Sequence, residues 1–429
     1  MDAERVVVIG CGYVGLTTGA CLARLGHDVT CCDVDGDKIA KLARGEVGIR
    51  EPDLDELVSE AVAAGSLRFT RDSARAVAAA EILFLCLPTP MGADGAADLS
   101  AVETVADEVR ELLPRGAVVV TKSTVPVGTA MRLTRLLGRE DVAVVSNPEF
   151  LREGFAVQDF LHPARVVVGA EEQQAAERVA SLYDPLDARA VLIDPVSAEL
   201  VKYAANGFLA TKLSYVNDLA ELCERTGGDI DVVTEGMKRD HRVAPSFLSA
   251  GPGWGGSCLP KDTAALLHTA DSAGVGFPLL GAAVRANAHH QARVVRKVVD
   301  CCGGDVSGSR IGLLGLTFKA GTGDLRESPA LAVARMLSDL GARLRGYDPT
   351  CAERSEVERI RCVADPYLAA EDADVVVLLT DWAEFAVLDW AKVAEVMRAP
   401  VLVDARNQLD PRALTREGMI WRGTGRTLR

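Results

Sequence analysis

Short apolar runs alternate with longer amphipathic segments in the first part of the chain. The run at 5–9 is followed by a glycine-rich turn, a helix-like segment at 16–25 and a second apolar run at 28–32. Further apolar runs lie at 82–87, 117–121, 142–145 and 166–168. Runs of this length between turn residues predict buried strands, and their alternation with helices predicts a mostly parallel, doubly wound sheet.

The pattern changes at Ser197. Apolar and aromatic residues then recur at three- and four-residue spacing to about Arg225, before the Gly227-Gly228 pair. This spacing predicts one long helix, and helices of this length favour packing against a second copy of the chain. Strand-like runs return at 310–315, 375–379 and 401–403, and predict a second α/β domain.

The expected architecture is therefore two Rossmann-like, doubly wound α/β domains joined by a central helical domain with a long helix. We place the domain boundaries at 1–196, 197–298 and 299–429. A chain of 429 residues is long enough for more than one core.

Composition narrows the range of partners. The formal net charge of -14 argues against nucleic acid or an anionic membrane surface as a partner.

The eleven cysteines are odd in number and scattered, which is typical of reduced thiols in a cytoplasmic protein. No CxxC or Cys/His ligand set appears, so we expect no metal site. Glycines and threonines interrupt the apolar stretch at 6–23, which argues against a signal or membrane-spanning segment.

A dinucleotide site is predicted directly after the first strand. In Gly10-x-Gly12-x-x-Gly15 the glycines permit a tight turn, close approach of a pyrophosphate and close helix packing. Asp33 ends the second strand at the spacing expected for a carboxylate that binds the adenosine ribose, which favours NAD over NADP. Lys38 either reaches the same ribose or phosphate or lies on the helix surface in solvent. The alternative is a glycine-rich turn that binds nothing.

A second chemical motif, Gly-Gly-Ser-Cys-Leu-Pro-Lys-Asp, places the Cys258 thiol close to Lys261 and Asp262. A thiol near cations is a suitable nucleophile because the thiolate is the reactive form. The alternative is a small core cysteine. Lys202 and Asn206 are four residues apart on the predicted long helix, hence on one face, where an ammonium and an amide can hold an oxyanion.

Seven motifs in order resemble the nucleotide-sugar dehydrogenases, the UDP-glucose/GDP-mannose dehydrogenase family. The resemblance spans nearly the whole chain. The motifs are GCGYVGL (10–16), PTP (88–90), STVPVGT (123–129), NPEFLREG (147–154), KYAANGFLATK (202–212), FLSAGPGWGGSCLPKD (247–262) and FKAGTGDLRES (318–328).

The resemblance implies a four-electron, NAD-dependent oxidation of the C6 alcohol of UDP-glucose to UDP-glucuronate. Cys258 would add to the aldehyde, giving a thiohemiacetal and then a thioester that water hydrolyses. Asp262, with Thr124 and a water, is implied as the base for the alcohol proton. Glu149 or Glu153 would activate the hydrolytic water. The alternative for Glu149 is an acid that stabilises a helix N-terminus.

The same resemblance implies the binding residues of the two α/β domains, the first for NAD and the last for the UDP-sugar. Those on the NAD side, besides the glycines, Asp33 and Lys38, are Tyr13, Val14, Pro88, Thr89, Ser123, Thr124, Glu153, Lys261 and Arg326. Those on the substrate side are Glu149, Phe150, Leu151, Arg152, Glu153, Lys202, Asn206, Arg242, Phe247, Leu248, Ser249, Gly253, Gly255, Lys319 and Arg406. Arg242 would come from a neighbouring subunit of a homodimer or higher homo-oligomer, and the loop at 247–255 would supply backbone amides and a flexible lid.

Two residues depart from the family pattern, Trp254 before the Gly-Gly pair and His241 beside Arg242. GDP-mannose or a UDP-N-acetylhexosamine therefore remains an alternative substrate. Two other classes also remain, an NAD-responsive regulatory protein without activity and a two-electron hydroxyacid dehydrogenase that needs no thiol.

Overall fold

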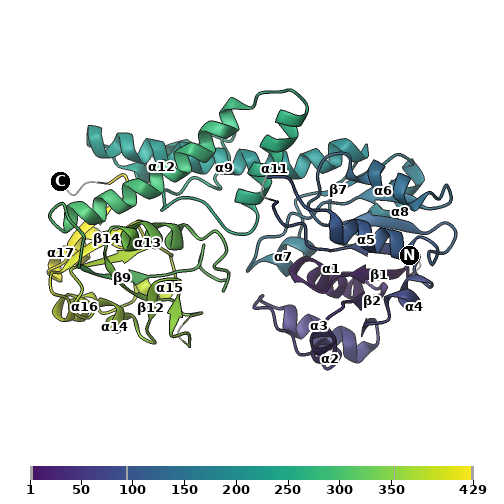
Figure 1. The fold of residues 1–429 in the computed structure, drawn as a ribbon, viewed down its shortest axis with the longest axis horizontal. Coiled ribbons are helices and arrows are strands. Elements are labelled where there is room, and N and C mark those ends of the chain that lie inside the picture. The colour runs from purple at the N-terminus through teal and green to yellow at the C-terminus, as the bar shows by residue number, and fades with distance from the viewer. Residues whose placement is uncertain (1–2, 93–94, 352, 427–429) are drawn as a thin grey trace. The chain divides into compact units, whose positions relative to one another are not determined.

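The computed structural model describes residues 3–92, 95–351 and 353–426. The chain forms two compact units (Figure 1). The first comprises Met1–Ala205 and Ala264–Val275, and the second comprises Asn206–Thr263 and Gly276–Arg429. Two helices, α9 (Pro195–Thr226) and α11 (Leu259–Ser272), contribute residues to both units.

The first unit is built on an eight-stranded sheet of order β3-β2-β1-β4-β5-β6-β7-β8. Neighbouring strands are parallel except β6 and β7, which are antiparallel. The strands are β1 (Arg5–Ile9), β2 (Asp28–Cys32), β3 (Leu67–Thr70), β4 (Ile82–Leu85), β5 (Val118–Thr121), β6 (Ala143–Ser146), β7 (Val166–Ala170) and β8 (Ala190–Ile193).

Helices cover both faces of this sheet. They are α1 (Tyr13–Arg24), α2 (Gly36–Leu42), α3 (Leu54–Ala64), α4 (Ser73–Val77), α5 (Ser100–Val109), α6 (Thr129–Leu137), α7 (Ala156–Leu161), α8 (Gln173–Ser181) and the 3-10 turn Asp184–Leu186. Alternate residues of β1 point into two different hydrophobic cores. Val6 and Val8 belong to the core that contains residues of α1 and α3, and Val7 and Ile9 belong to the core that contains residues of α5 and α6. Both faces of β1 are therefore buried, which is why its sequence is continuously apolar.

The second unit contains a seven-stranded sheet of order β11-β12-β10-β9-β13-β14-β15, in which only β11 and β12 pair antiparallel among the described strands. The strands are β9 (Arg310–Leu314), β10 (Arg343–Tyr347), β11 (Glu356–Val357), β12 (Ile360–Cys362), β13 (Val375–Leu378), β14 (Val401–Asp404) and β15 (Ile420–Gly423). The helices are α10 (Ile230–Lys238), α12 (Pro278–Cys301), α13 (Pro329–Asp339), α14 (Pro366–Ala370), α15 (Ala383–Ala386), α16 (Trp390–Val396) and α17 (Pro411–Arg416).

The predicted fold class is confirmed, with two mostly parallel sheets and one long helix. The helix predicted at 16–25 begins earlier, at Tyr13, because the glycine turn leads directly into it with Gly12 as N-cap. The long helix has 32 residues and extends slightly beyond the predicted limits at both ends.

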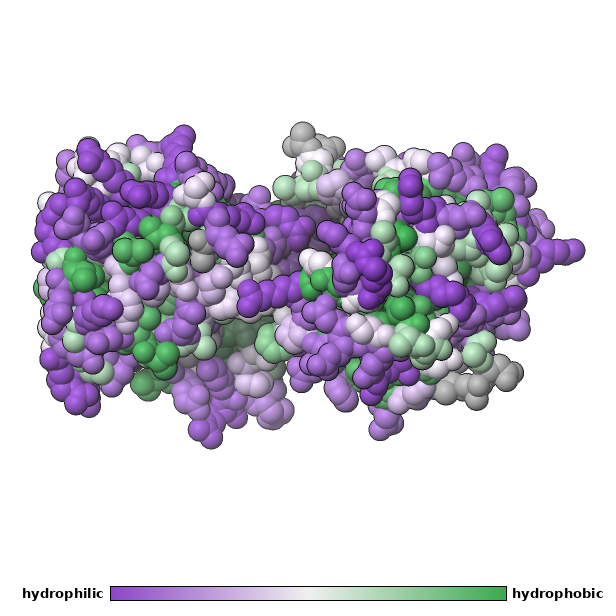
Figure 2. Space-filling view, turned by 90° about the horizontal axis from the view of Figure 1, so that it is seen from below, coloured by the Kyte–Doolittle hydropathy of each residue, from purple (hydrophilic) through white to green (hydrophobic). Residues whose placement is uncertain are grey.

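Hydrophilic residues cover most of the face seen in Figure 2, and hydrophobic residues form small separate groups on it. None of the helices in the described ranges combines enough length with enough apolar side chains to span a bilayer. Within the same ranges no cluster of three or more His, Cys, Asp or Glu side chains has the arrangement of a metal site.

Candidate active site

The glycine turn after β1 leaves open space at one of its three glycines. Gly10 has a φ of +98°, and a Cβ there would lie 2.4 Å from the carbonyl oxygen of Cys86. A Cβ at Gly15 would lie 1.8 Å from the Gly10 carbonyl oxygen, whereas a Cβ at Gly12 would meet nothing within 4 Å. Gly10 and Gly15 are thus required for packing. The open side at Gly12, at the N-terminus of α1, fits the close approach of a pyrophosphate.

Asp33 follows β2 and lies beside this turn. Its carboxylate accepts hydrogen bonds from the backbone N–H of Cys11 at 2.9 Å and from the Lys38 ammonium at 2.9 Å. Burial raises the pKa of Asp33, but the hydrogen bonds from Lys38 and the backbone outweigh it, so the net shift is downward. An ionised acceptor at this place fits a ribose hydroxyl. Lys38 pairs with Asp33 rather than lying unpaired on the helix surface.

The PTP and STVPVGT motifs contact each other in the first unit. The Thr89 hydroxyl donates to the Thr124 carbonyl oxygen at 2.9 Å, and the Ser123 hydroxyl donates to the Leu87 carbonyl oxygen at 2.7 Å. Segments predicted to line the NAD side, more than thirty residues apart in sequence, are therefore held together.

A buried ion pair joins Glu149 to Lys202. The Lys202 Nζ lies 3.0 Å from Glu149 Oε1, and both side chains are almost fully buried. The other carboxylate oxygen of Glu149 accepts the Leu151 backbone N–H at 2.6 Å. Glu149 precedes α7 by several residues, so it does not cap that helix, and the alternative interpretation as a helix N-terminal acid is wrong. Lys202 also lies 5.4 Å from the centre of the Phe150 ring.

The flanking residues of NPEFLREG have separate partners. Arg152 forms an ion pair with Asp159 at 2.6 Å, and its backbone carbonyl accepts the Tyr13 hydroxyl at 3.1 Å. Arg165 lies 3.8 Å from the centre of the Phe150 ring. Glu153 is partly exposed.

In the second unit, Cys258 lies immediately before α11. It is exposed, whereas eight of the eleven cysteines are buried, and all eleven are free thiols. Its backbone carbonyl accepts the N–H of Asp262 at 2.8 Å, and its sulfur lies 3.6 Å from the Ser257 hydroxyl. The thiol is therefore accessible at a helix N-terminus.

Asp262 is 1% exposed and lies one helical turn from the thiol. Its Oδ2 accepts the Asn206 amide at 2.6 Å. The Lys261 ammonium lies 3.1 Å from Oδ1, but without the geometry of a hydrogen bond, so within the described residues this buried oxygen accepts none. A buried carboxylate oxygen that accepts no hydrogen bond is suited to bind a water.

The predicted substrate cations differ in exposure. The Arg406 guanidinium is largely buried and donates to the backbone carbonyls of Leu379 and Phe318 at 2.9 and 3.2 Å. Burial lowers its pKa. Lys319 lies 5.5 Å from the centre of the Phe318 ring.

Arg242 and Arg326 are exposed. Each forms an ion pair at 2.6 Å with the aspartate two residues before it, Asp240 and Asp324. These two ion pairs are local in sequence.

The loop at 247–255 is partly buried and packs against other segments of the chain. Leu248 and Trp254 are buried, and a Cβ at Gly255 would lie 1.9 Å from the Glu327 carbonyl oxygen. Phe247 adopts a φ of +61°, in the left-handed region that non-glycine residues rarely occupy.

The three successive parts of the chain match three domain models. Residues 4–187 match the NAD binding domain of the UDP-glucose/GDP-mannose dehydrogenase family, residues 196–289 its central domain, and residues 312–411 its UDP binding domain. The chain belongs to this family.

Individual relatives match over nearly the full length of this family member. It is 44% identical to UDP-glucose 6-dehydrogenase of Rhizobium meliloti (strain 1021), covering 98% of this chain and 99% of the relative. It is 41% identical to UDP-glucose 6-dehydrogenase TuaD of Bacillus subtilis (strain 168), covering 99% and 93%. The solved UDP-glucose dehydrogenase of Pyrobaculum islandicum superposes with a TM-score of 0.92 at 36% identity, covering 99% and 98%.

Sequence patterns do not identify two buried charged groups of this family member, Glu51 and Lys122. Glu51 is 5% exposed, accepts the Tyr13 hydroxyl, and accepts the backbone N–H groups of Gly154 and Ala156 at 2.7 and 2.6 Å. Its carboxylate thus ties α1 to the NPEFLREG segment. The charge of Glu51 gives no local signal because its partners are 38, 103 and 105 positions away.

Lys122 is the second such group. Its ammonium lies 2.9 Å from the Asn147 side-chain oxygen and 3.1 Å from the Tyr183 hydroxyl, and burial lowers its pKa to about 8. Lys122 directly follows the apolar run 117–121. This position is the sequence signal that could have identified it, because a charge that continues a buried strand needs a partner.

Proposed function

We propose that the protein oxidises the C6 alcohol of UDP-glucose to the carboxylate of UDP-glucuronate, with NAD as cofactor. The observation that carries the proposal is the exposed Cys258 thiol at the start of α11, close to the buried Asp262 and Asn206 pair. Relatives 40–44% identical along the chain are named UDP-glucose 6-dehydrogenases, which supports UDP-glucose over other nucleotide sugars.

In the first oxidation, the alcohol proton passes to Asp262 through the buried oxygen that accepts no hydrogen bond, with Thr124 and a water. The Lys202 ammonium and the Asn206 amide stabilise the developing alkoxide. Bound NAD supplies the acceptor for the hydride that leaves C6 in each of the two oxidations. Gly12, Asp33 and the start of α1 are the groups that would hold this cofactor.

In the second half of the reaction, the Cys258 sulfur adds to the aldehyde carbon and the aldehyde oxygen takes a proton, which gives a thiohemiacetal. Loss of the second hydride and of the hydroxyl proton leaves a thioester. Water, with its proton accepted by Glu149, attacks the carbonyl carbon, and the Cys258 thiol leaves as the acid forms. Because the intermediate is covalent, no free aldehyde escapes.

The remaining features of the proposal concern binding and assembly. Arg406 and Lys319 bind the two phosphates of the substrate, and the three domains at 1–196, 197–298 and 299–429 divide NAD binding, catalysis and UDP-sugar binding. A protein with eleven free thiols suits the reducing cytoplasm.

We further propose a homodimer that forms through α9. Phe208, Tyr215 and Leu222 are 65%, 56% and 55% exposed and follow one another at seven-residue spacing, so they form a stripe along one side of the helix. We name these three residues the α9 stripe. In such a dimer the exposed Arg242 is supplied to the substrate site of the neighbouring subunit.

The test is to incubate the protein with NAD and, separately, with UDP-glucose, GDP-mannose and UDP-N-acetylmannosamine, and to measure NADH and product acid. The third sugar is included because a UDP-D-ManNAc dehydrogenase of Pyrococcus horikoshii superposes with a TM-score of 0.87 at 30% identity. We expect two NADH per sugar and the highest kcat/KM with UDP-glucose. One NADH per sugar would contradict the thioester route, and no turnover with any of the three would favour a regulatory protein.

A further inference from the structure

The backbone of the loop at 247–255 is held by buried polar side chains of two helices. The Gly251 N–H donates to the Asn217 side-chain oxygen of α9 at 3.0 Å, and the Gly251 carbonyl lies 2.5 Å from His290 Nε2 of α12. Asn287 of α12 accepts the Trp254 N–H at 2.8 Å and donates to its carbonyl at 2.9 Å. Both polar backbone groups of Gly251 and of Trp254 are thus bound by the helical frame.

The hydrogen bond to Gly251 defines the protonation of the His290 ring. A carbonyl oxygen can only accept, so Nε2 carries the hydrogen, and in the neutral ring Nδ1 is then an acceptor. The Arg293 guanidinium faces Nδ1 at 3.5 Å. Burial and the charge of Arg293 lower the pKa of His290 to about 4, so the ring is neutral at physiological pH.

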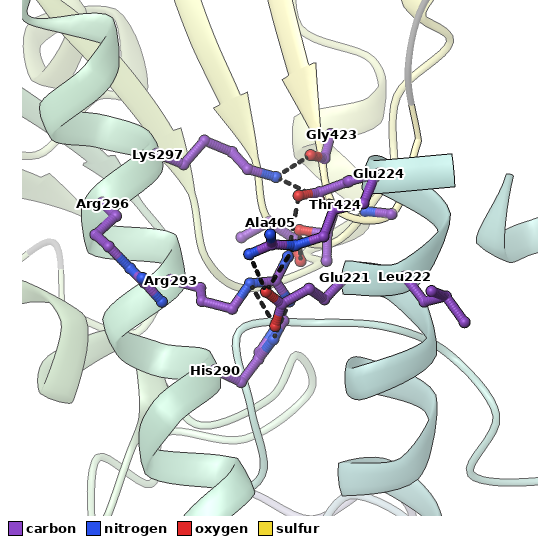
Figure 3. A network of polar contacts seen from close by, with 12 residues as sticks. Glu221, Leu222, Glu224, His290, Arg293, Arg296, Lys297, Ala405, Gly423 and Thr424 are labelled. Atoms are coloured by element: carbon purple, nitrogen blue, oxygen red, sulfur yellow. Dashed lines mark hydrogen bonds and ion pairs between the residues drawn. The ribbon is translucent and has the colours of Figure 1, made fainter. Parts of the chain in front are cut away.

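Two carboxylates of α9 hold Arg293 in this orientation (Figure 3). Arg293 lies 3.2 Å from Glu221 and 3.0 Å from Glu224. Glu224 also accepts the Lys297 ammonium at 2.7 Å, and Lys297 donates in addition to the Gly423 carbonyl at the end of β15. His290 therefore lies beside a network of ion pairs that joins α9, α12 and β15.

The other side of Gly251 faces a substrate cation. A Cβ built on Gly251 would lie 3.1 Å from the Arg406 guanidinium and 3.6 Å from its Cδ. Arg406 packs against the bare backbone of Gly251, while its own hydrogen bonds go to Leu379 and Phe318. Gly251 thus lies between His290, which its carbonyl contacts, and Arg406, which leaves little room for a side chain at this position.

We propose that His290 is a positioning residue for nucleotide-sugar binding: it fixes the Gly251 carbonyl, and the fixed loop holds the Arg406 guanidinium in place for the substrate diphosphate. This inference rests on the proposed function for the role of Arg406. His290 itself contacts Gly251 and Arg293, and acts through them on binding.

The test compares His290→Leu with His290→Gln. Leucine fills a similar volume but leaves the buried Gly251 carbonyl without a donor, which should raise KM for UDP-glucose and the Kd for UDP about tenfold while kcat changes less than threefold. Glutamine can donate an amide hydrogen to the same carbonyl, so it should restore both constants to within about threefold of wild type. The Kd for UDP is measured by calorimetry without NAD.

Val298→Ala is the matched control, because Val298 is fully buried on the same helix and belongs to the core with β9 and α13. It should lower the melting temperature without changing KM or the Kd for UDP. If His290→Leu does not fold, His290→Asn replaces it, since its amide is too short to reach Gly251.

UDP affinity that is unchanged in His290→Leu, or in His290→Asn where that variant replaces it, would overturn the positioning role. A loss of UDP affinity in Val298→Ala as large as that in His290→Leu would overturn it as well. A wild-type protein that binds UDP, loses affinity in His290→Leu and yet oxidises no nucleotide sugar would overturn the proposed function while retaining the role of His290.

Discussion

At the scale of single residues, one buried carboxylate links the start of α9 to the N-terminus of α6. The Glu199 side chain accepts the backbone N–H groups of Gly128 and Ala130 at 2.6 and 2.7 Å. Burial raises the pKa of Glu199 to about 7, and these hydrogen bonds offset only part of that rise. The folded state therefore binds the Glu199 proton more tightly than the unfolded chain does.

The expected consequence is a pH-dependent stability. A carboxyl whose pKa is raised on folding contributes stability that is fully present below the ordinary value of about 4.5 and is lost as pH rises to about 7. The unfolding free energy of wild type relative to Glu199→Gln should therefore be higher at pH 4.5 than at pH 7.5, by on the order of 2 kcal/mol. Urea titrations of both proteins at the two pH values measure it, and an equal difference at both would refute the expectation.

A second prediction at this scale concerns Gly12. Its φ of -77° is available to any residue, and a Cβ there meets no atom within 4 Å, so Gly12→Val should fold with little loss of stability. The valine side chain would occupy the space needed by the pyrophosphate, and the Kd for NAD should rise at least about tenfold. Calorimetry with NAD and a melting curve provide the readouts.

Gly48→Val is the matched control, since a Cβ at Gly48 also meets nothing within 4 Å and no NAD contact is expected there. If Gly12→Val binds NAD as tightly as Gly48→Val does, the open side of Gly12 is not the phosphate site.

At the scale of elements, the α9 stripe distinguishes the long helix from an ordinary core helix. Its fully buried residues, among them Tyr203, Ala210 and Val216, face the described interior, while the stripe leaves three large apolar side chains in solvent. Tyr215→Glu places a charge in the middle of the stripe. We expect it to weaken the dimer about a hundredfold or more, because an unpaired charge would be buried at the contact.

Light scattering after size-exclusion chromatography measures this change at micromolar concentration. Leu368→Glu, an exposed apolar residue on α14, is the control and should leave the mass unchanged. A wild-type protein that is monomeric under these conditions would exclude the proposed assembly.

At the scale of the whole molecule, continuous apolar runs predict the strands that are buried on both faces, such as β1 and β4, and the three- and four-residue spacing predicts the long helix. The short strands β3, β11, β12 and β15 are not predicted, because they lack such a run, and β8 is not predicted either, although its four residues are apolar. Local sequence patterns also do not predict the antiparallel pairing of β6 with β7, which depends on the path of the intervening chain. In the same way, the motif around Cys258 reveals the thiol and Asp262, whereas the contacts of Glu51 with Gly154 and of His290 with Gly251 join residues 103 and 39 positions apart, which no local pattern shows.

The division of the chain into two units leads to a prediction for the complete enzyme. The glycine turn proposed to bind NAD lies in the first unit, and Cys258 and Arg406 lie in the second, so loss of the thiol should leave both ligands bound. Cys258→Ala should keep the Kd for NAD and for UDP within twofold of wild type, while acid formation falls about a thousandfold or more, since the proposed thioester forms on the Cys258 sulfur. Cys302→Ala, which changes a partly buried cysteine outside the motif, should retain full activity. Acid production that continues undiminished in Cys258→Ala would mean that the aldehyde is oxidised without a covalent bond to sulfur, and the two-electron dehydrogenase alternative would then have to be reconsidered.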